Sequence, residues 1–180
     1  NIDFQNAKDA NGNALTLDRL TLDRQTLTDI SLGKVQKWND PAIVALNPTL
    51  QPYLPDADIF TAHRSDGSGT TEIFTKSLAS FSDEWKNGPG AGTTVEWPAE
   101  KAGHPGGGGR GNAGVAALVN LTKNSIGYVE LSYAISNNIL YTQMVNKAGK
   151  TLKANADSVQ SAMNDYADSF SDKLTNTIVD

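Results

Sequence analysis

The segment over 63–71, with the sequence HRSDGSGTT, concentrates the residues of this chain that are best suited to bind an anion. It follows an apolar run over 57–62 that is typical of a buried strand, and it precedes an apolar periodicity that is typical of a helix. Free backbone N–H groups and the helix dipole favour an anion where a strand passes into a helix. The segment therefore predicts a site for a tetrahedral oxyanion such as phosphate or sulfate.

Each residue type in this loop has a function in that prediction. Gly67 and Gly69 permit the left-handed or closely approaching backbone that turns several N–H groups toward one point and forms an anion nest. Arg64 offers a bidentate fork to two oxygens of the anion. Further hydroxyl donors come from Ser68, Thr70 and Thr71.

Asp66 is the residue of the loop that bears on which oxyanion is bound. An ionised carboxylate only accepts hydrogen bonds, and beside an anion it is repelled unless the anion brings a proton. Phosphate at neutral pH still carries a proton, whereas sulfate carries none. A carboxylate here would accept from phosphate and leave sulfate in an unpaired like-charge contact, so we expect selectivity for phosphate.

Other interpretations of the same residues stay open at this point. Asp-Gly and Ser-Gly pairs also build an ordinary tight turn with a helix cap. A nucleotide P-loop would require a lysine directly after the last glycine, and no lysine follows Gly69 until Lys76. A nucleophile elbow would require glycine two residues before Ser68, where Asp66 stands. The loop thus favours binding over catalysis.

Strands alternating with helices must position this loop. Helix caps predict a short helix over 26–32 that Gly33 ends, and a second helix that Asp40 and Pro41 begin. Apolar patterns predict strand-like alternation over 15–24, strands over 57–62, 125–129 and 140–145, and helices beyond the loop, over 115–120 and over 157–166. Turn residues predict Gly-rich loops over 87–92 and 102–114 and a hairpin turn over 147–150. The order indicates an α/β lobe whose ligand loops gather at the strand C-termini.

Length and composition narrow the classes of function. The 180 residues suit one domain with one hydrophobic core. The net charge is −5 and the lysines are scattered, so no basic stripe indicates a nucleic-acid partner. The chain has no cysteine and only two distant histidines, which gives no basis for a metal site or a cofactor. We expect Trp38, Trp85 and Trp97 to be packing anchors.

The loop closely resembles the phosphate loop of the substrate-binding protein of bacterial high-affinity phosphate ABC transporters. The resemblance extends in order and spacing over most of the chain up to about Tyr141. Its further blocks are LTDISLGKVQKWNDPAI at 27–43, LNP at 46–48, EWK at 84–86, VEWP at 95–98, GN at 111–112, GVAA at 114–117 and IGYVE at 126–130. The enlarged Gly-rich loop and the tandem LTLDR at 15–24 depart from the familiar pattern, and we interpret both as tolerated insertions.

The resemblance implies a type II periplasmic-binding-protein (venus-flytrap) fold, in which residues 1–180 form the second, inserted α/β lobe, with a mixed central sheet flanked by helices. It implies that phosphate is bound by Arg64, Asp66, Ser68, Gly69 and Thr70, with Ser65, Gly67 and Thr71 as supporting residues. The first lobe of such proteins has no counterpart in this sequence. The expected partners are inorganic phosphate, that missing first lobe and the membrane permease, and the expected location is periplasmic or extracellular, with a lipid anchor as one possibility in the full-length protein.

Three functions compete on the sequence alone. The first is a solute receptor that delivers phosphate to a permease and performs no covalent chemistry. The second is a secreted stand-alone or fused lobe that serves as an adhesion or assembly module and retains a vestigial phosphate loop. The third is hydrolysis of phosphate esters, which would need a base and usually a metal ion, and the sequence offers neither near Ser68.

Overall fold

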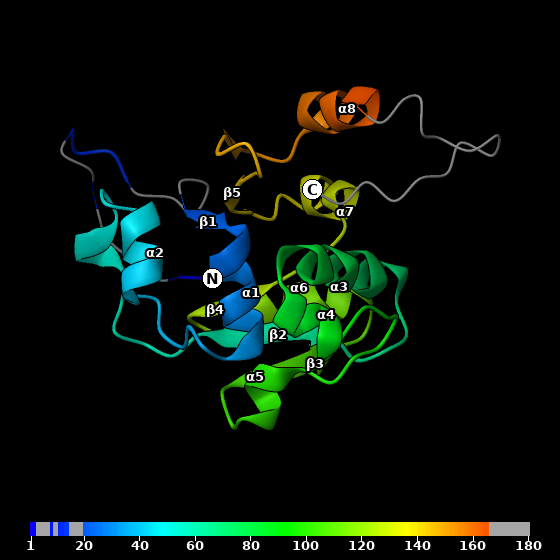
Figure 1. Ribbon diagram of the computed structural model, residues 1–180. Helices are drawn as coiled ribbons and strands as arrows, with labels where there is room; N and C mark the ends of the chain where they lie inside the picture. The colour runs from blue at the N-terminus through cyan, green and yellow to red at the C-terminus, as the bar shows by residue number, and fades with distance from the viewer. Residues whose placement is uncertain (3–7, 9–10, 15–19, 166–180) are drawn as a thin grey trace.

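The structure, a computed structural model, describes residues 1–2, 8, 11–14 and 20–165 (Figure 1). Within this part of the chain the strands form two three-stranded sheets, in the orders β3-β2-β4 and β1-β5-β6, with helices around them. The α/β class predicted from the sequence is confirmed, and the strands divide between a parallel sheet and a mixed one. The first copy of the LTLDR repeat, over 15–19, lies outside the described residues.

The parallel sheet positions the candidate loop. Its central strand β2 (Phe60–Arg64) lies between β3 (Gly106–Gly109) and β4 (Ser125–Gly127), and both pairings are parallel. In this register Arg64 pairs with Gly109, so both strands end at the same level. Because parallel strands end at a common edge, the loop after β2 and the turn after β3 meet there.

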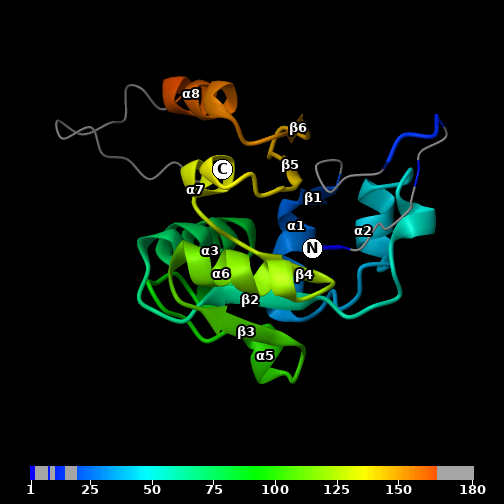
Figure 2. The same ribbon diagram turned by 180° about the vertical axis from the view of Figure 1, so that it is seen from behind.

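The second sheet lies at the other end of the molecule from β3 (Figures 1 and 2). Strand β1 (Thr21–Asp23) runs parallel to β5 (Gln143–Val145), which pairs antiparallel with β6 (Thr151–Leu152). The turn between β5 and β6 is closed by hydrogen bonds between Asn146 and Lys150, so the predicted hairpin is confirmed. Of the strand-like alternation predicted over 15–24, the described residues 20–24 include β1, which ends at Asp23 because that residue caps the helix that follows.

Gly33 ends the first helix and Asp40 begins the second as the sequence predicts, whereas the first helix begins two residues before the predicted Thr26, with Asp23 as its cap. The Asp23 side chain accepts the Thr26 N–H at the start of α1 (Arg24–Leu32), and Gly33 ends that helix with a left-handed φ of 78°. Asp40 caps α2 (Pro41–Leu46), which Asn47 ends. A short 3-10 turn, η2 (Gln51–Tyr53), occupies the proline-rich connector before β2.

The Gly-rich segment over 102–114 is more regular than predicted. Its four consecutive glycines form strand β3, since a sheet ladder needs only backbone groups, and helix α6 begins at Gly111 rather than at Val115. A Cβ placed on Gly109 would lie 2.3 Å from the carbonyl carbon of Gly114. This strand and helix therefore pack backbone against backbone, which only glycine allows.

The remaining helices are α3 (Gly69–Phe81), α4 (Asp83–Asn87), α5 (Pro98–Lys101), α6 (Gly111–Leu121), α7 (Leu131–Ser136) and α8 (Ala156–Asp165). Among them, α6 packs against all three strands of the parallel sheet and α5 against β3, whereas α8 lies at the other end of the molecule (Figure 1). Figure 2 shows α5 beyond β3, on the side away from α3 and α6. Trp38 and Trp85 are buried and donate their indole N–H groups to the carbonyls of Asn124 and Gly90, so these two predicted anchors are confirmed. No helix in the described part of the chain is both long and apolar enough to cross a membrane.

Candidate anion-binding site

The candidate site lies where β2 passes into α3. Ser68 caps α3, because its Oγ accepts the Thr71 N–H at 3.2 Å, and its own N–H donates to the carbonyl of Thr93 at 3.0 Å. Ser68 is buried, whereas Gly69 is exposed and Thr70 is half-buried. As the first two residues of the helix, Gly69 and Thr70 present N–H groups for which an α-helix has no acceptor. The loop thus offers donors at the positive end of a 13-residue helix.

Arg64 and Asp66 form a bidentate ion pair inside the loop. The Arg64 Nε donates to Asp66 Oδ1 at 2.8 Å, and Nη2 donates to Oδ2 at 2.7 Å. The sequence led us to expect this fork to face the oxyanion, and in the structure two of its nitrogens face Asp66 instead. A carboxylate two residues away in the same tight loop is close enough to match the planar fork in geometry and charge.

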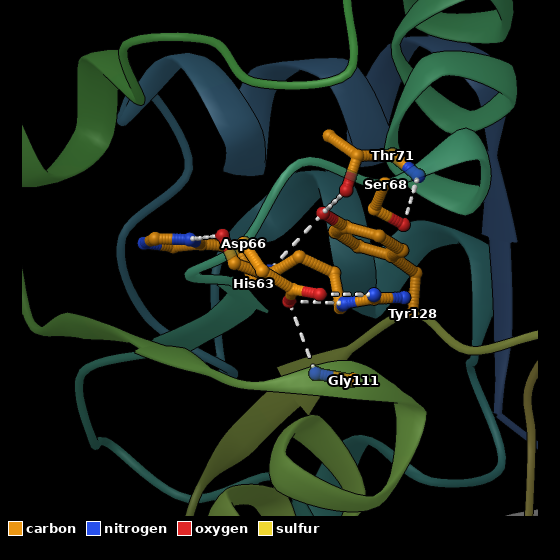
Figure 3. A network of polar contacts seen from close by, with 7 residues as sticks. His63, Asp66, Ser68, Thr71, Gly111 and Tyr128 are labelled. Atoms are coloured by element: carbon orange, nitrogen blue, oxygen red, sulfur yellow. Dashed lines mark hydrogen bonds and ion pairs between the residues drawn. The ribbon is translucent and has the colours of Figure 1, made fainter.

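Asp66 also binds the start of α6. The Gly111 N–H donates to Asp66 Oδ1 at 3.0 Å (Figure 3), and Gly111 has a left-handed φ of 67°. The hydrogen bonds from Arg64 and then from the Gly111 N–H hold the pKa of the Asp66 carboxyl well below its usual range. Asp66 is therefore ionised at neutral pH, and it joins the loop after β2 to the start of α6.

Gly67 and Gly69 do not adopt the left-handed backbone that was one of the two predicted for them. Neither Gly67 nor Gly69 has a left-handed φ, so the left-handed nest expected from the sequence is not formed by these two residues. Apart from the chain neighbours and the backbone of α3 itself, no described atom lies within 4 Å of a Cβ built on either of them. Their small size leaves this face of the loop open, and the left-handed glycine of the site is Gly111.

Tyr128, the residue after β4, contacts both ends of the loop. Its hydroxyl oxygen accepts the Arg64 backbone N–H at 3.3 Å and lies 2.7 Å from Thr71 Oγ1 (Figure 3). Its ring stacks on Phe74 of α3 with centroids 4.4 Å apart. Burial raises the pKa of the Tyr128 hydroxyl above its ordinary value, so the group keeps its proton at neutral pH. Thr71 directs its hydroxyl to this contact and acts as a support.

The structure brings together the eight residues that the sequence predicts for the site, since they run from the last residue of β2 through the loop to the first turn of α3. Three contacting residues were not assigned a role from the sequence, namely Gly111, Tyr128 and Thr93. The first two stand in the blocks GN and IGYVE of the resemblance, which was the available signal. A cavity of about 310 Å³, lined mainly by apolar side chains, includes His63 and Tyr128 but none of the predicted anion contacts.

This fold and site define an α/β binding-protein lobe. The structure is similar to a high affinity periplasmic phosphate-binding protein (PfluDING) solved with phosphate, with a TM-score of 0.61 and 19% identity over 82% of this chain and 40% of that chain. That similarity concerns the fold. The family model described as PBP superfamily domain matches residues 5–179, and the chain therefore belongs to this family.

Curated relatives agree with the resemblance found in the sequence. The chain is 49% identical over 144 residues to the phosphate-binding protein PstS of Xylella fastidiosa, which is 80% of this chain and 37% of the relative. It is 47% identical over 148 residues to PstS of Pasteurella multocida, covering 82% and 41%. It is 43% identical over 144 residues to PstS of Methanocaldococcus jannaschii, covering 80% and 37%. The chain thus spans less than half the length of these relatives.

Proposed function

We propose that this chain is the phosphate-contacting lobe of a solute receptor and binds inorganic phosphate at the loop that joins β2 to α3. The observation that carries the proposal is the open N-terminus of α3 beside the paired Arg64 and Asp66. A helix N-terminus with adjacent cationic and hydroxyl donors is a site for a tetrahedral anion. The names of the relatives, phosphate-binding proteins at 43% to 49% identity, support phosphate as that anion.

The proposed contacts follow from the donors that remain open. Because Ser68 Oγ already accepts the Thr71 N–H, its own hydrogen is available to an anion. The N–H groups of Gly69 and Thr70 and the Thr70 hydroxyl complete one side of the anion. Arg64 adds positive charge at the edge of the loop. Ser65, Gly67 and Thr71 support the loop without contacting phosphate.

Asp66 gives the proposed selectivity for phosphate over sulfate. A carboxylate has about four lone-pair positions, and three of those of Asp66 are occupied by Arg64 Nε, Arg64 Nη2 and Gly111 N–H. The position that remains can accept the proton of hydrogen phosphate. Sulfate brings no proton and would face an unpaired like charge there.

We further propose that the whole protein is a two-lobed receptor that passes phosphate to the membrane permease of an ABC transporter. In this proposal a first lobe closes over the bound anion, no covalent chemistry occurs, and the protein acts in the periplasm or outside the cell, free or lipid-anchored. The relatives, more than twice as long as the matched segment, support a second lobe. They give no support to an adhesion or assembly module.

Two helix-capping serines provide the test. Ser82 caps α4 as Ser68 caps α3, since its side chain accepts the Trp85 N–H. We expect Ser68→Ala and Ser82→Ala each to cost about 1 kcal/mol of stability. NMR titration with phosphate should move the Gly69 and Thr70 amide signals, and only Ser68→Ala should weaken binding. Equal phosphate affinity of the two variants, or shifts spread over the whole surface, would contradict the proposal.

A further inference from the structure

His63, the residue before Arg64 in β2, is held on two sides by helix α5. Its side chain is 14% exposed. Its ring stacks on Trp97, which directly precedes α5, with centroids 5.0 Å apart and an interplanar angle of 23°. Its Nε2 lies 2.8 Å from Oε1 of Glu100, a residue of α5. Neither of these two atoms has another hydrogen-bonding partner among the residues that the structure describes.

The other ring nitrogen reaches the loop. His63 Nδ1 lies 2.9 Å from the carbonyl oxygen of Arg64, which can only accept a hydrogen bond. Nδ1 must therefore carry a hydrogen and donate it. The Nε2 of His63 faces a carboxylate oxygen of Glu100, so polar contacts hold the ring at both of its nitrogens. The pair with Glu100 thus fixes which way the imidazole ring faces.

Hydrogen bonds hold the backbone on both sides of Arg64. Its N–H donates to the Tyr128 hydroxyl, and its carbonyl accepts from His63. The N–H of Ser65, in the same peptide unit as that carbonyl, donates to the carbonyl of Gly109 at 3.1 Å. Both peptide planes that flank the Arg64 Cα are therefore tied to neighbouring elements, so the direction of its Cα–Cβ bond is set by these contacts, and the ion pair with Asp66 holds the guanidinium.

The glycine strand is shaped around this cluster. A Cβ on Gly106 would lie 2.4 Å from Oε1 of Glu100, and one on Gly108 would lie 2.9 Å from the Cβ of Ser65 and 3.3 Å from Cε1 of His63. Larger residues at these positions would displace the carboxylate or the ring. The glycines of β3 thus leave space for His63 and Glu100. This explains why glycines stand at positions that the sequence alone led us to interpret as an insertion.

We propose that His63, held by Glu100 and Trp97, is a positioning residue for phosphate binding. It acts through the Arg64 carbonyl and does not touch the anion. This inference rests on the proposed function, because it concerns how the same loop is preorganised. A donor that fixes the loop lowers the ordering cost of binding.

Substitutions that separate the two ring nitrogens test the proposal. His63→Phe keeps the ring volume and the stacking on Trp97 but removes both nitrogens, and we expect phosphate affinity to fall about two- to twelvefold, the equivalent of one neutral hydrogen bond. His63→Asn places an amide N–H near the position of Nδ1, so it should recover most of the affinity. His104→Asn is the matched control, since His104 packs against Gly33 and not against the loop, and it should bind phosphate as the unchanged chain does.

The readouts distinguish failure of this inference from failure of the proposed function. Urea unfolding of each variant without phosphate separates a loss of fold from a loss of positioning. Phosphate binding by the unchanged chain with equal binding by His63→Phe would overturn the inference alone, and so would His63→Asn binding no better than His63→Phe. If the unchanged chain binds no phosphate, the proposed function fails. The ¹⁵N spectrum of the imidazole ring tests the ring orientation even in that case. The proposed orientation requires a hydrogen on Nδ1, and a ring with its hydrogen only on Nε2 would contradict it.

Discussion

Two glycines within the site give opposite predictions for the same change, glycine to alanine. Gly109 ends β3, and a Cβ there would lie 2.3 to 2.5 Å from backbone atoms of Gly114 and Val115. Gly69 begins α3, and a Cβ there meets no described atom within 4 Å apart from its chain neighbours and the backbone of its own helix. Neither glycine has a left-handed φ, so steric contact and not backbone conformation decides the outcome.

The magnitudes follow from these contacts. Gly109→Ala forces α6 away from β3, because backbone atoms cannot rotate aside as side chains do. Overpacking costs about 1–3 kcal/mol, and this site belongs at the upper end of that range. A loss of about 2–3 kcal/mol lowers the Tm of a chain of this size by about 4–12 °C. Gly69→Ala should instead raise stability by up to about 1 kcal/mol, since alanine favours a helix over glycine.

The effect of Gly69→Ala on phosphate binding should be opposite to its effect on stability. Because Cα–Cβ bonds tilt toward the helix N-terminus, the methyl group of Gly69→Ala would point toward the proposed anion and weaken phosphate binding. Urea unfolding without ligand and a calorimetric or NMR phosphate titration measure the two quantities. A Gly69→Ala chain that is more stable and still binds phosphate as the unchanged chain does would refute the placement of the anion. An unchanged stability of Gly109→Ala would refute the close packing of β3 on α6.

Four further expectations concern the same loop. Tyr128→Phe leaves the Arg64 N–H without its acceptor and should cost about 1–3 kcal/mol of stability in urea unfolding, whereas Tyr141→Phe, which removes an exposed hydroxyl contact with a backbone carbonyl, should cost much less; equal costs would contradict the support role. Arg64→Ala should weaken phosphate binding about tenfold or more, and Arg64→Lys should restore only part of the lost affinity. Undiminished phosphate binding by Arg64→Ala in calorimetry would remove Arg64 from the site. Asp66→Asn should let sulfate compete better against phosphate, and the idea fails if the competition is unchanged. Because the pKa of Asp66 is lowered in the folded chain, its contribution to the stability of the fold is complete above its ordinary pKa of about 4. That contribution is lost as the pH falls below that value. The chain alone should bind phosphate only weakly, near 1 mM if a complete receptor binds at about 1 μM and each lobe supplies half of the free energy, and micromolar binding by a monomer would contradict this half-site estimate.

The sequence predicted the elements whose signals are local. The caps at Gly33 and Asp40 and the turn over 147–150 are all found where short-range chemistry placed them. The strand before the candidate loop was predicted over 57–62 and is found at Phe60–Arg64, a shift of a few residues. The Gly-rich segment was wrongly predicted as a loop, because a strand of four glycines has no side-chain pattern to reveal it.

By itself the sequence determined the location of the candidate site and the donors that it offers, since the proposed anion-binding residues over 64–71 are contiguous and a strand-to-helix loop collects their donors locally. It did not determine how the Arg64 backbone N–H and the Asp66 carboxylate are held, because their partners Tyr128 and Gly111 come from distant parts of the chain. Only the parallel pairing of β2 with β3 and β4 brings Gly111 to Asp66 and Tyr128 to the Arg64 N–H. Contacts across such distances depend on sheet register and helix packing, which no local pattern encodes.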